Sequence, residues 1–323
     1  MKGLVYIIII NYCNHSETIE CLESTLKTNY SNFKIIVVDN NSPNCSIDFL
    51  CTWAESSEES VTTQNQYFDK FIQPNIEKPI QYSVWAEDDF LKQNDIQEKV
   101  IFVKANENGG FAKGNNIGIQ YAMKDSECSY VWLLNNDTVI KPDTLSKLVE
   151  YAEQHQVGIC GSTLLYYHNP EQVQAYGGHI NRFFGTGSHI LSTSEIEKKL
   201  DYVVGASFLI NRKVIEKIGL LPEEYFLYYE ETDYCFNAKK CGFSLGIALE
   251  SIVFHKEGAS TGTNQNANLR SEFSDVLTLK NRIRFHRKYL GGGVGLWLGL
   301  FIAFFNRVRR KQCRKISTVN RRS

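Results

Sequence analysis

Apolar runs and helical patterns alternate at the start of the chain. Val5–Ile10 is a largely β-branched run, as expected of a strand covered on both faces of a parallel sheet. Residues 15–28 then carry apolar side chains at helical spacing behind Ser16, a candidate N-cap, and Phe33–Val38 is a second buried run. Strand, helix and strand in this order predict a right-handed βαβ unit, in which ligands bind beyond the carboxyl ends of the strands.

The same alternation continues to residue 255, with two interruptions. Further strands are predicted at Val100–Val103, Tyr130–Leu134, Val157–Leu165, Val203–Ile210 and Ile247–Phe254, with helical segments between them. Residues 54–98 are acidic and rich in Gln, Asn and Ser, so we expect an insertion beside the core, and Gly177–Ser188 indicates a glycine-rich loop region. The pattern predicts an α/β fold with a mostly parallel central sheet flanked by helices.

Composition narrows the class of protein. A chain of 323 residues with 43% hydrophobic content can build one large domain with an appendage, which excludes a disordered chain or a disulfide-stabilised miniprotein. The net charge of −1 argues against a nucleic-acid partner. Nine cysteines without CxxC spacing predict no zinc site and no redox dithiol, but reduced and mostly buried thiols of a cytosolic protein.

The C-terminal segment, residues 291–323, differs from the rest of the chain. Gly291–Phe305 carries no charge and is shorter than the roughly 20 residues that span a bilayer. Residues 306–323 then hold eight Arg and Lys and no acid. This pattern predicts an interfacial helix that contacts an anionic cytoplasmic leaflet through residues 291–315, and hence a cytoplasmic protein peripheral on the plasma membrane. The alternative is a helix packed on the domain or on a partner subunit.

Polar side chains follow the predicted strands at the edge where ligands bind. Asp137 comes after the run Tyr130–Leu134, together with Asn135 and Asn136. Mg²⁺ takes one or two protein carboxylates plus phosphate oxygens, so a single Asp is sufficient to hold the ion against a diphosphate. The alternative role, a cap of the next helix, is better filled by Asp143.

Other strand ends carry groups suited to a nucleotide. Asn11 and Asn41 lie at the ends of the first two strands, and Asp39 can either accept from a nucleobase N–H or form an Asx-turn. A glycine- and asparagine-rich loop then leads into a helix N-terminus, where a diphosphate or base can bind. Its candidate contacts are Asn108, Gly109, Lys113 and Asn115.

Titratable groups recur towards the end of the domain. Glu230, Glu231 and Asp233 follow an aromatic run, as helix N-terminal acids favoured by the dipole or as a general base beside an aromatic wall. His255 ends the last predicted strand. A lone histidine is usually structural, but the end of a strand favours a metal ligand.

In this order the motifs resemble the family 2 glycosyltransferases with the GT-A fold, especially those that assemble bacterial surface polysaccharides, including rhamnosyltransferase-like members. The resemblance covers about residues 4–290 and implies a GT-A (Rossmann-like) domain at 1–290, with the insertion at 54–98 and a C-terminal helical extension. It rests on Ile8-Ile-Ile-Asn-Tyr12, Val37-Val-Asp-Asn-Asn-Ser42, Asn108-Gly-Gly-Phe-Ala-Lys-Gly-Asn-Asn-Ile-Gly118, Leu134-Asn-Asn-Asp137, Gly205-Ala-Ser-Phe-Leu-Ile210, Phe226-Leu-Tyr-Tyr-Glu-Glu-Thr-Asp233 and His255.

The resemblance implies roles for the residues on the donor side. Asp39 would contact the nucleobase, and the loop 108–115 the nucleotide. Asp137 matches the last, metal-binding acid of the family's Asp-x-Asp motif, and Asn135 stands where the first acid usually lies. His255 matches a further ligand of the divalent cation, Mg²⁺ or Mn²⁺.

On the acceptor side, the pair Glu230-Glu231 matches the Glu-Asp element that supplies the base. Because Glu replaces Asp at 231, both Glu231 and Asp233 stay open as the base. Gly205 and Ala206 match a strand that lines the acceptor side. The implied reaction is inverting transfer of a hexosyl or rhamnosyl group from a nucleoside-diphosphate sugar to a hydroxyl of a glycan or lipid-linked acceptor, in cell-surface polysaccharide biosynthesis.

Two other classes of protein are alternatives to a glycosyltransferase. A sugar nucleotidyltransferase needs a glycine-rich loop with Arg or Lys directly after the first strand, where this chain has Asn11-Tyr-Cys-Asn-His15. A non-catalytic protein of the same fold that binds sugar nucleotides or glycans would not need Asp137, the acidic trio and His255 together.

Overall fold

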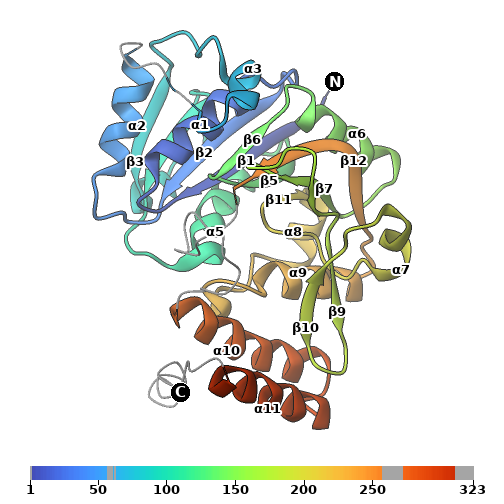
Figure 1. Cartoon of the computed structure of the whole chain (residues 1–323). Helices are drawn as coiled ribbons and strands as arrows, with labels where there is room; N and C mark the ends of the chain where they lie inside the picture. Colours follow the sequence, from blue (N-terminus) through green and yellow to red (C-terminus); the bar gives the residue numbers. More distant parts are fainter. Residues whose placement is uncertain (1, 57–60, 62, 257–271, 310–323) are drawn as a thin grey trace.

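The computed structural model describes residues 2–56, 61, 63–256 and 272–309. One mixed sheet runs through the molecule with helices on both faces (Figure 1). Its strand order is β3-β4-β2-β1-β5-β11-β7-β12-β6, with β8 on β7, and β9 and β10 form a separate pair. The expected α/β architecture with a mostly parallel central sheet is confirmed.

The bounds of the elements follow the chain in order. The strands are β1 (Leu4–Asn11), β2 (Phe33–Asp39), β3 (Tyr82–Ala86), β4 (Val100–Lys104), β5 (Cys128–Asn135), β6 (Thr138–Ile140), β7 (Ile159–Tyr166), β8 (Val173–Ala175), β9 (Gly178–Asn181), β10 (Thr186–His189), β11 (Ser207–Asn211) and β12 (Leu245–His255). The α-helices are α1 (His15–Thr25), α2 (Ser46–Glu55), α3 (Asp69–Ile72), α4 (Glu87–Phe90), α5 (Gly110–Ala122), α6 (Thr144–Gln154), α7 (Ile196–Lys199), α8 (Arg212–Ile218), α9 (Glu230–Lys240), α10 (Glu272–Tyr289) and α11 (Val294–Arg309).

The β-branched run of β1 is buried on both faces because successive side chains point to opposite sides of the sheet. Ile7 and Ile9 join the apolar layer formed with α1, α2 and α6, and Ile8 joins the layer formed with α5, α8 and α9. Gly118 lets α5 approach closely, since a Cβ there would lie 2.8 Å from Ile8 Cδ1. The strand ends are therefore held between two packed layers.

Some segments differ from the sequence prediction. Part of the insertion at 54–98 belongs to the sheet, since β3 pairs in parallel with β4 as the edge strand. The region expected as a glycine-rich loop holds the β9–β10 hairpin, whose strand β10 is exposed throughout and so carries no apolar alternation. Helix α1 begins at His15 behind Asn14, so Ser16 lies inside its first turn and is not the N-cap.

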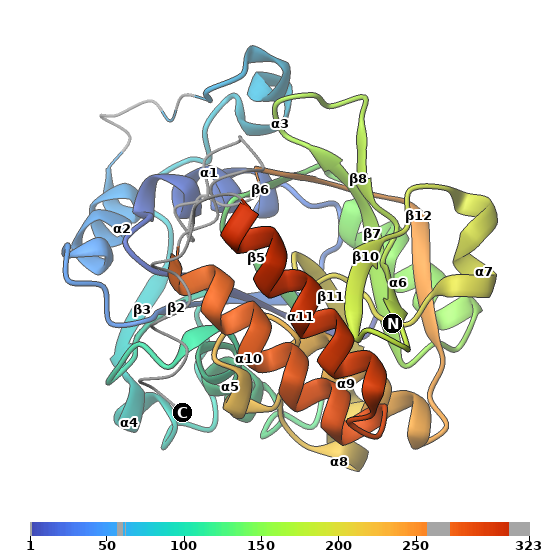
Figure 2. The same ribbon diagram turned by 60° about the horizontal axis from the view of Figure 1, so that its bottom comes forward.

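The last two described helices, α10 and α11, lie below α9 in Figure 1. In Figure 2, α11 runs alongside α10 on the outside of the molecule. Within the described ranges, no helix combines the length and apolar character needed to cross a bilayer. The basic residues expected to contact the membrane beyond 309 lie outside the described residues.

Candidate active site

The carboxyl ends of β1, β2 and β5 lie side by side. In the parallel register Asn11 is the partner of Asp39, and Ile10 is the partner of Asn135. Asn11 Nδ2 donates to Asp39 Oδ1 at 2.6 Å in a buried position. The sheet thus gathers three of the predicted site positions at one edge.

The Asp39 carboxylate organises the turn after β2. Its Oδ1 accepts from Ser42 Oγ at 2.6 Å as well as from Asn11, and its Oδ2 accepts from the Ser42 backbone N–H at 2.9 Å. This is the Asx-turn alternative. A carboxylate has roughly four acceptor sites, so three donors leave room for about one more, such as a nucleobase N–H.

A buried chain of hydrogen bonds joins the strand ends. Asn136 Nδ2 donates to Thr18 Oγ1 at 3.0 Å, and Thr18 Oγ1 donates to Asn11 Oδ1 at 2.9 Å. Asn11 in turn donates to Asp39. Because each of these hydrogen bonds joins two groups of the protein, the strand-end half of the site is preorganised.

The glycine- and asparagine-rich loop packs against the Asp39 turn. Asn40 Nδ2 donates to Asn108 Oδ1 at 3.1 Å and to the Gly110 carbonyl at 3.0 Å, and Asn108 Oδ1 also accepts from the Gly110 N–H. Asn41 Nδ2 donates to the Asn106 carbonyl at 3.2 Å. The structure therefore brings the loop to the strand ends, as predicted.

Three further loop residues contribute differently. Gly109 is the N-cap residue of α5. Lys113 forms an ion pair with Glu107, and buried Asn115 donates to the Phe111 carbonyl within the helix at 2.9 Å. Lys113 and Asn115 thus have partners within the protein, and contact with a nucleotide stays a prediction for both.

Asp137 and His255 meet beside this edge. Asp137 lies in the turn between β5 and β6, and the pairing of β12 with β6 places His255 opposite Thr138. Asp137 Oδ1 lies 3.3 Å from His255 Nε2. Burial by itself would raise the pKa of Asp137, but the charge and hydrogen bond of protonated His255, with Lys256, outweigh it and lower the pKa.

The second ring nitrogen of the histidine decides how the pair can act. His255 Nδ1 lies 2.8 Å from Gln174 Oε1, an acceptor, so Nδ1 carries the proton that it donates. In the neutral imidazole, the Nε2 lone pair then faces the Asp137 carboxylate. Two acceptors at this distance repel each other unless a proton or a cation lies between them, so the pair fits a divalent cation.

The protein alone offers few ligands to such a cation. Among the described residues, no group of three or more His, Cys, Asp and Glu side chains is arranged to hold a metal ion. Mg²⁺ and Mn²⁺ with one carboxylate and one imidazole would need oxygens from a phosphate to complete their coordination. The pair therefore fits a metal that arrives with, or is held by, a diphosphate.

Two adjacent acids begin α9. Glu230 is 3% exposed, and its Oε2 and that of Glu231 are both buried with no hydrogen-bond partner among the described residues. Burial and the neighbouring Glu231 charge raise the pKa of Glu230 well above its usual value. Burial raises the pKa of Glu231 to about 7, against the opposing effect of backbone N–H groups at the start of α9.

Asp233, two residues after Glu231, has a different environment. It accepts from the Tyr225 hydroxyl at 2.6 Å and the Tyr289 hydroxyl at 2.8 Å, and it pairs with Lys288 at 2.8 Å. These contacts tie α9 to α10. The structure brings Asp233 near the pair of glutamates but commits its carboxylate to packing the two helices together.

The loop before α9 is strained. Phe226, Tyr228 and Tyr229 have φ values of 61°, 71° and 76°, a region that bulky residues rarely occupy. Asn281 of α10 holds this conformation, because its Nδ2 lies 2.7–2.9 Å from the carbonyls of Tyr225, Leu227 and Tyr228. Asn281 is not among the residues predicted from the sequence, because no local motif marks it.

The turn at residues 205–206 connects the strand ends with the start of α9. The Asn135 N–H donates to the Ala206 carbonyl at 3.1 Å. A Cβ built on neighbouring Gly205 would lie 3.9 Å from Glu231 Cγ and 3.4 Å from Phe111 Cζ. Residues 205 and 206 precede β11, so they line this region from a turn and not from the expected strand.

The loop before α9 also touches the glycine-rich loop. The Phe111 N–H donates to the Phe226 carbonyl at 2.7 Å, and a Cβ on Gly110 would lie 2.1 Å from the same oxygen. Only glycine fits there, so Gly110 allows the two loops to pack together. Glu231 and the strand ends thus belong to one continuous region.

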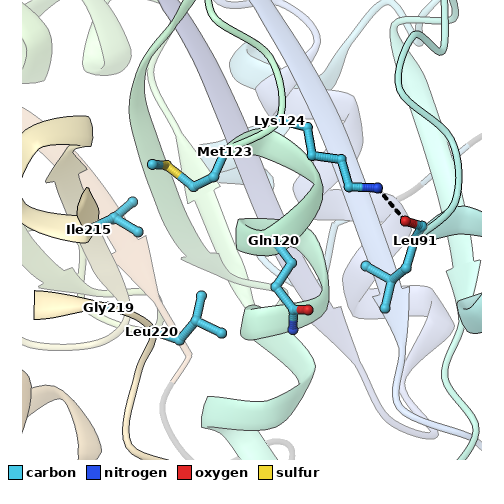
Figure 3. A pocket seen from close by; sticks show the side chains of 7 residues that line it. All are labelled: Leu91, Gln120, Met123, Lys124, Ile215, Gly219 and Leu220. Carbon is cyan, nitrogen blue, oxygen red and sulfur yellow. Dashed lines mark hydrogen bonds between the residues drawn. The ribbon is translucent and has the colours of Figure 1, made fainter.

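The hollow in Figure 3 lies elsewhere, beside the C-terminal end of α5. Gln120, Lys124 and Leu220 line it, and Lys124 donates to the Leu91 carbonyl. Because α5 starts at the carboxyl ends of the strands and runs back, this hollow is near their amino ends. It contains none of the predicted site residues.

Comparison with solved structures identifies the fold of the chain. Against the mannosyltransferase PcManGT from Pyrobaculum calidifontis, solved with GDP-Man and Mn²⁺, the TM-score is 0.54 at 11% identity, over 91% of this chain and 66% of that one. This likeness establishes the fold alone, which is the GT-A fold.

A family model matches part of the chain. Residues 88–219 match the model described as Glycosyl transferase family 2, which agrees with the resemblance drawn from the motifs. The matched segment includes Asp137, the loop 108–115 and Gly205. It does not include Asp39, Glu231 or His255, whose roles rest on the geometry.

Two relatives found by sequence are named as sugar transferases. The chain is 26% identical over 197 residues to the low-salt glycan biosynthesis hexosyltransferase Agl10 of Haloferax volcanii, covering 59% of this chain and 62% of the relative. It is 22% identical over 162 residues to the dTDP-rhamnosyl transferase RfbF of Shigella flexneri, covering 50% and 53%. The chain thus spans less than two thirds of the length of either relative.

Several residues of the site were missed at the level of sequence. Asn40 and Ser42 lie within the quoted motif after β2, so their polarity and position were available signals. Thr18 and Gln174 carried none, because their partners lie far away in the sequence.

Proposed function

We propose that this protein is an inverting, metal-dependent glycosyltransferase that moves a sugar from a nucleoside-diphosphate sugar to an acceptor hydroxyl. One observation carries the proposal. Glu231, with a buried and unpartnered carboxylate oxygen, lies across the Gly205–Ala206 turn from the strand end that holds the Asp137–His255 pair. A general base and a cation-binding pair on the two sides of this turn suit displacement at a carbon with a diphosphate leaving group.

Glu231 is the base in this proposal. Its pKa of about 7 suits proton transfer at neutral pH, and its Oε2 has no partner among the described residues to lose. The acceptor hydroxyl transfers its proton to this oxygen as its own oxygen attacks the anomeric carbon. The proposal does not give this role to Asp233, because two hydroxyls and Lys288 already occupy its carboxylate.

Glu230 is the neighbour of this base. Burial and then the charge of Glu231 raise the pKa of Glu230 well above its usual value, so Glu230 holds its proton more tightly than an exposed glutamate does. Glu230 itself is almost fully buried, so we assign it no contact with the acceptor.

Asp137 and His255 would hold the divalent cation, Mg²⁺ or Mn²⁺, with Gln174 orienting the imidazole. A cation bound there neutralises charge on the leaving diphosphate, which is worth several kcal/mol of barrier. Asn135, which lies 3.4 Å from His255 through its Nδ2, would supply the amide where the family motif has its first acid. Asp39, Asn41 and the loop 108–115 would form the nucleotide side.

The substrates follow from chemistry and relatives together. The two relatives are named as a hexosyltransferase and a dTDP-rhamnosyl transferase, which supports a hexose or deoxyhexose donor. The acceptor would be a growing glycan or a lipid-linked glycan of a cell-surface polysaccharide. The net charge of −1 gives nucleic acid no part in this proposal.

The test is a panel of sugar nucleotides incubated with the protein, with and without Mn²⁺ and with excess chelator. We expect metal-dependent release of nucleoside diphosphate from one donor, and a product of opposite anomeric configuration when an acceptor is added. Binding of donor without any release would instead identify a non-catalytic binder. Release of pyrophosphate from a sugar phosphate and a nucleoside triphosphate would identify a nucleotidyltransferase.

A further inference from the structure

Helix α11 has two unlike faces. One face packs on the body of the protein: Leu296 is buried, a Cβ on Gly295 would lie 2.0 Å from the Phe183 carbonyl oxygen, and one on Gly299 would lie 1.9 Å from Arg282 Nη2. The glycines let this face lie flat against α10 and the β9–β10 hairpin. The face that packs on the protein therefore carries Gly295 and Gly299 beside Leu296, and most of the large side chains lie on the opposite face.

The other face is apolar and exposed. Trp297 is 63% exposed and Phe301 60%. Water-facing rings and branched chains recur along the whole described length of the helix, and Phe183 of the adjoining hairpin adds to them. The exposed apolar residues of α11 are Val294, Trp297, Leu298, Phe301, Ile302, Phe304 and Phe305. Such a contiguous patch on a protein surface marks an interaction site.

Charge indicates what covers this face. The residues that follow the patch in sequence include Arg307, Arg309, Arg310, Lys311, Arg314 and Lys315, with no acid among residues 306–323. The helix has 16 residues, about 24 Å at 1.5 Å per residue, which is short of a hydrocarbon core of about 30 Å. An apolar face with tryptophan, continued by cations, matches the boundary between acyl chains and anionic headgroups.

We propose that α11 docks in the plane of an anionic bilayer surface, with its exposed apolar face in the lipid. In Figure 2 the helix lies on the outside of the molecule, alongside α10, as such docking requires.

Helix α11 contacts the region of the candidate base, Glu231, through α10. Helix α10, on which α11 packs, holds the loop before α9 through Asn281 and holds α9 itself through Lys288 and Tyr289. A bilayer under α11 would therefore lie on the side of the domain that carries Glu231. This consequence rests on the proposed function, and it would present a lipid-linked acceptor to the base.

Vesicle flotation tests the docking without any substrate. The full chain is mixed with vesicles of phosphatidylcholine alone or with about one-third phosphatidylglycerol, at near-physiological salt. We expect flotation with the anionic vesicles and little with the neutral ones. The double variant W297S/F301S should reduce the bound fraction at least tenfold, and R307Q/R309Q/R310Q about a hundredfold, at about fivefold for each cation removed.

A matched control separates docking from general stickiness. Phe49 and Leu191 are 50% and 62% exposed on other parts of the molecule, so F49S/L191S should float like the unmodified chain. The inactive variant E231Q should also float normally, which keeps this test independent of the proposed reaction. Thermal melting of W297S/F301S should match that of the unmodified chain, because both side chains face solvent.

Two results would overturn the proposal. One is a chain that stays unbound with both kinds of vesicle. The other is a stable dimer in solution that W297S/F301S dissociates, since a second copy of the chain would then cover the face.

Discussion

The two halves of the candidate site treat their polar groups in opposite ways. At the strand ends, a continuous chain of hydrogen bonds joins Asn136, Thr18, Asn11 and Asp39. At the start of α9, buried carboxylate oxygens lack partners and the pKa values are raised.

This difference suits the two tasks that the proposed function gives to these halves. A satisfied network is rigid and holds its shape when a ligand arrives, which suits recognition of a nucleotide. An unsatisfied buried carboxylate costs stability and keeps a high affinity for protons, which suits a base. The strained loop before α9 adds to that cost, and Asn281 offsets it from another helix.

The largest expected effect comes from removing the carboxylate proposed to hold the cation, which lies next to the satisfied half. Asp137→Ala should lower the rate of transfer on the order of a thousandfold or more, because the charge on the leaving diphosphate is no longer neutralised. Initial rates with saturating Mn²⁺ measure this, and thermal melting checks the fold. Asp143→Ala, in an acid that makes no side-chain capping bond to α6, is the matched control and should stay active. Near-normal turnover by folded Asp137→Ala would remove Asp137 from the mechanism.

The second prediction separates the two acids of α9. Glu231→Gln should abolish transfer and leave the fold intact. Asp233→Asn should keep most of the activity but lose about 2 kcal/mol of unfolding free energy, since it weakens charge-assisted bonds that tie α9 to α10. Rates and denaturant melts on both variants decide. The reverse pattern would make Asp233 the base.

The third prediction concerns pH. A base must be ionised, so kcat/KM should rise with pH and level off above about 7, the pKa of Glu231. Stability should move the other way. The folded pKa is raised above an unfolded value of about 4.3, so the stabilising contribution is complete below that value and is lost as the pH rises towards 7.

Glu231→Gln tests that sign, because glutamine has no charge to desolvate. The variant should gain on the order of 1–3 kcal/mol of unfolding free energy relative to the unmodified chain at pH 8, and much less at pH 4. Melts at the two pH values measure it. An equal difference at both values would show that burial of Glu231 carries no electrostatic cost.

The smallest effect is expected from the residue that orients the imidazole. Gln174→Leu removes the acceptor for His255 Nδ1 and should weaken Mn²⁺ binding about tenfold in the presence of nucleoside diphosphate. Calorimetry measures the affinity, and exposed Gln172 offers Gln172→Leu as the control. Unchanged affinity would show that Gln174 only packs β8.

The sequence by itself determined the alternation of strands and helices and the edge of the sheet at which several of the predicted site residues gather. Those features are written in local periodicity and in short motifs, as in β1 and the turn after β2. It left out β10, because an exposed strand has no apolar alternation, and it left open the choice between Glu231 and Asp233.

Only the tertiary structure revealed β10 and the different environments of these two acids. Glu231 and Asp233 are only two residues apart in α9, yet Lys288 and the hydroxyls of Tyr225 and Tyr289 occupy the Asp233 carboxylate, whereas burial raises the pKa of Glu231. Gln174 and Asn281 likewise gain their importance from partners far along the chain. The environment of a charge is set by whatever the fold packs around it, and no local pattern of residues records that.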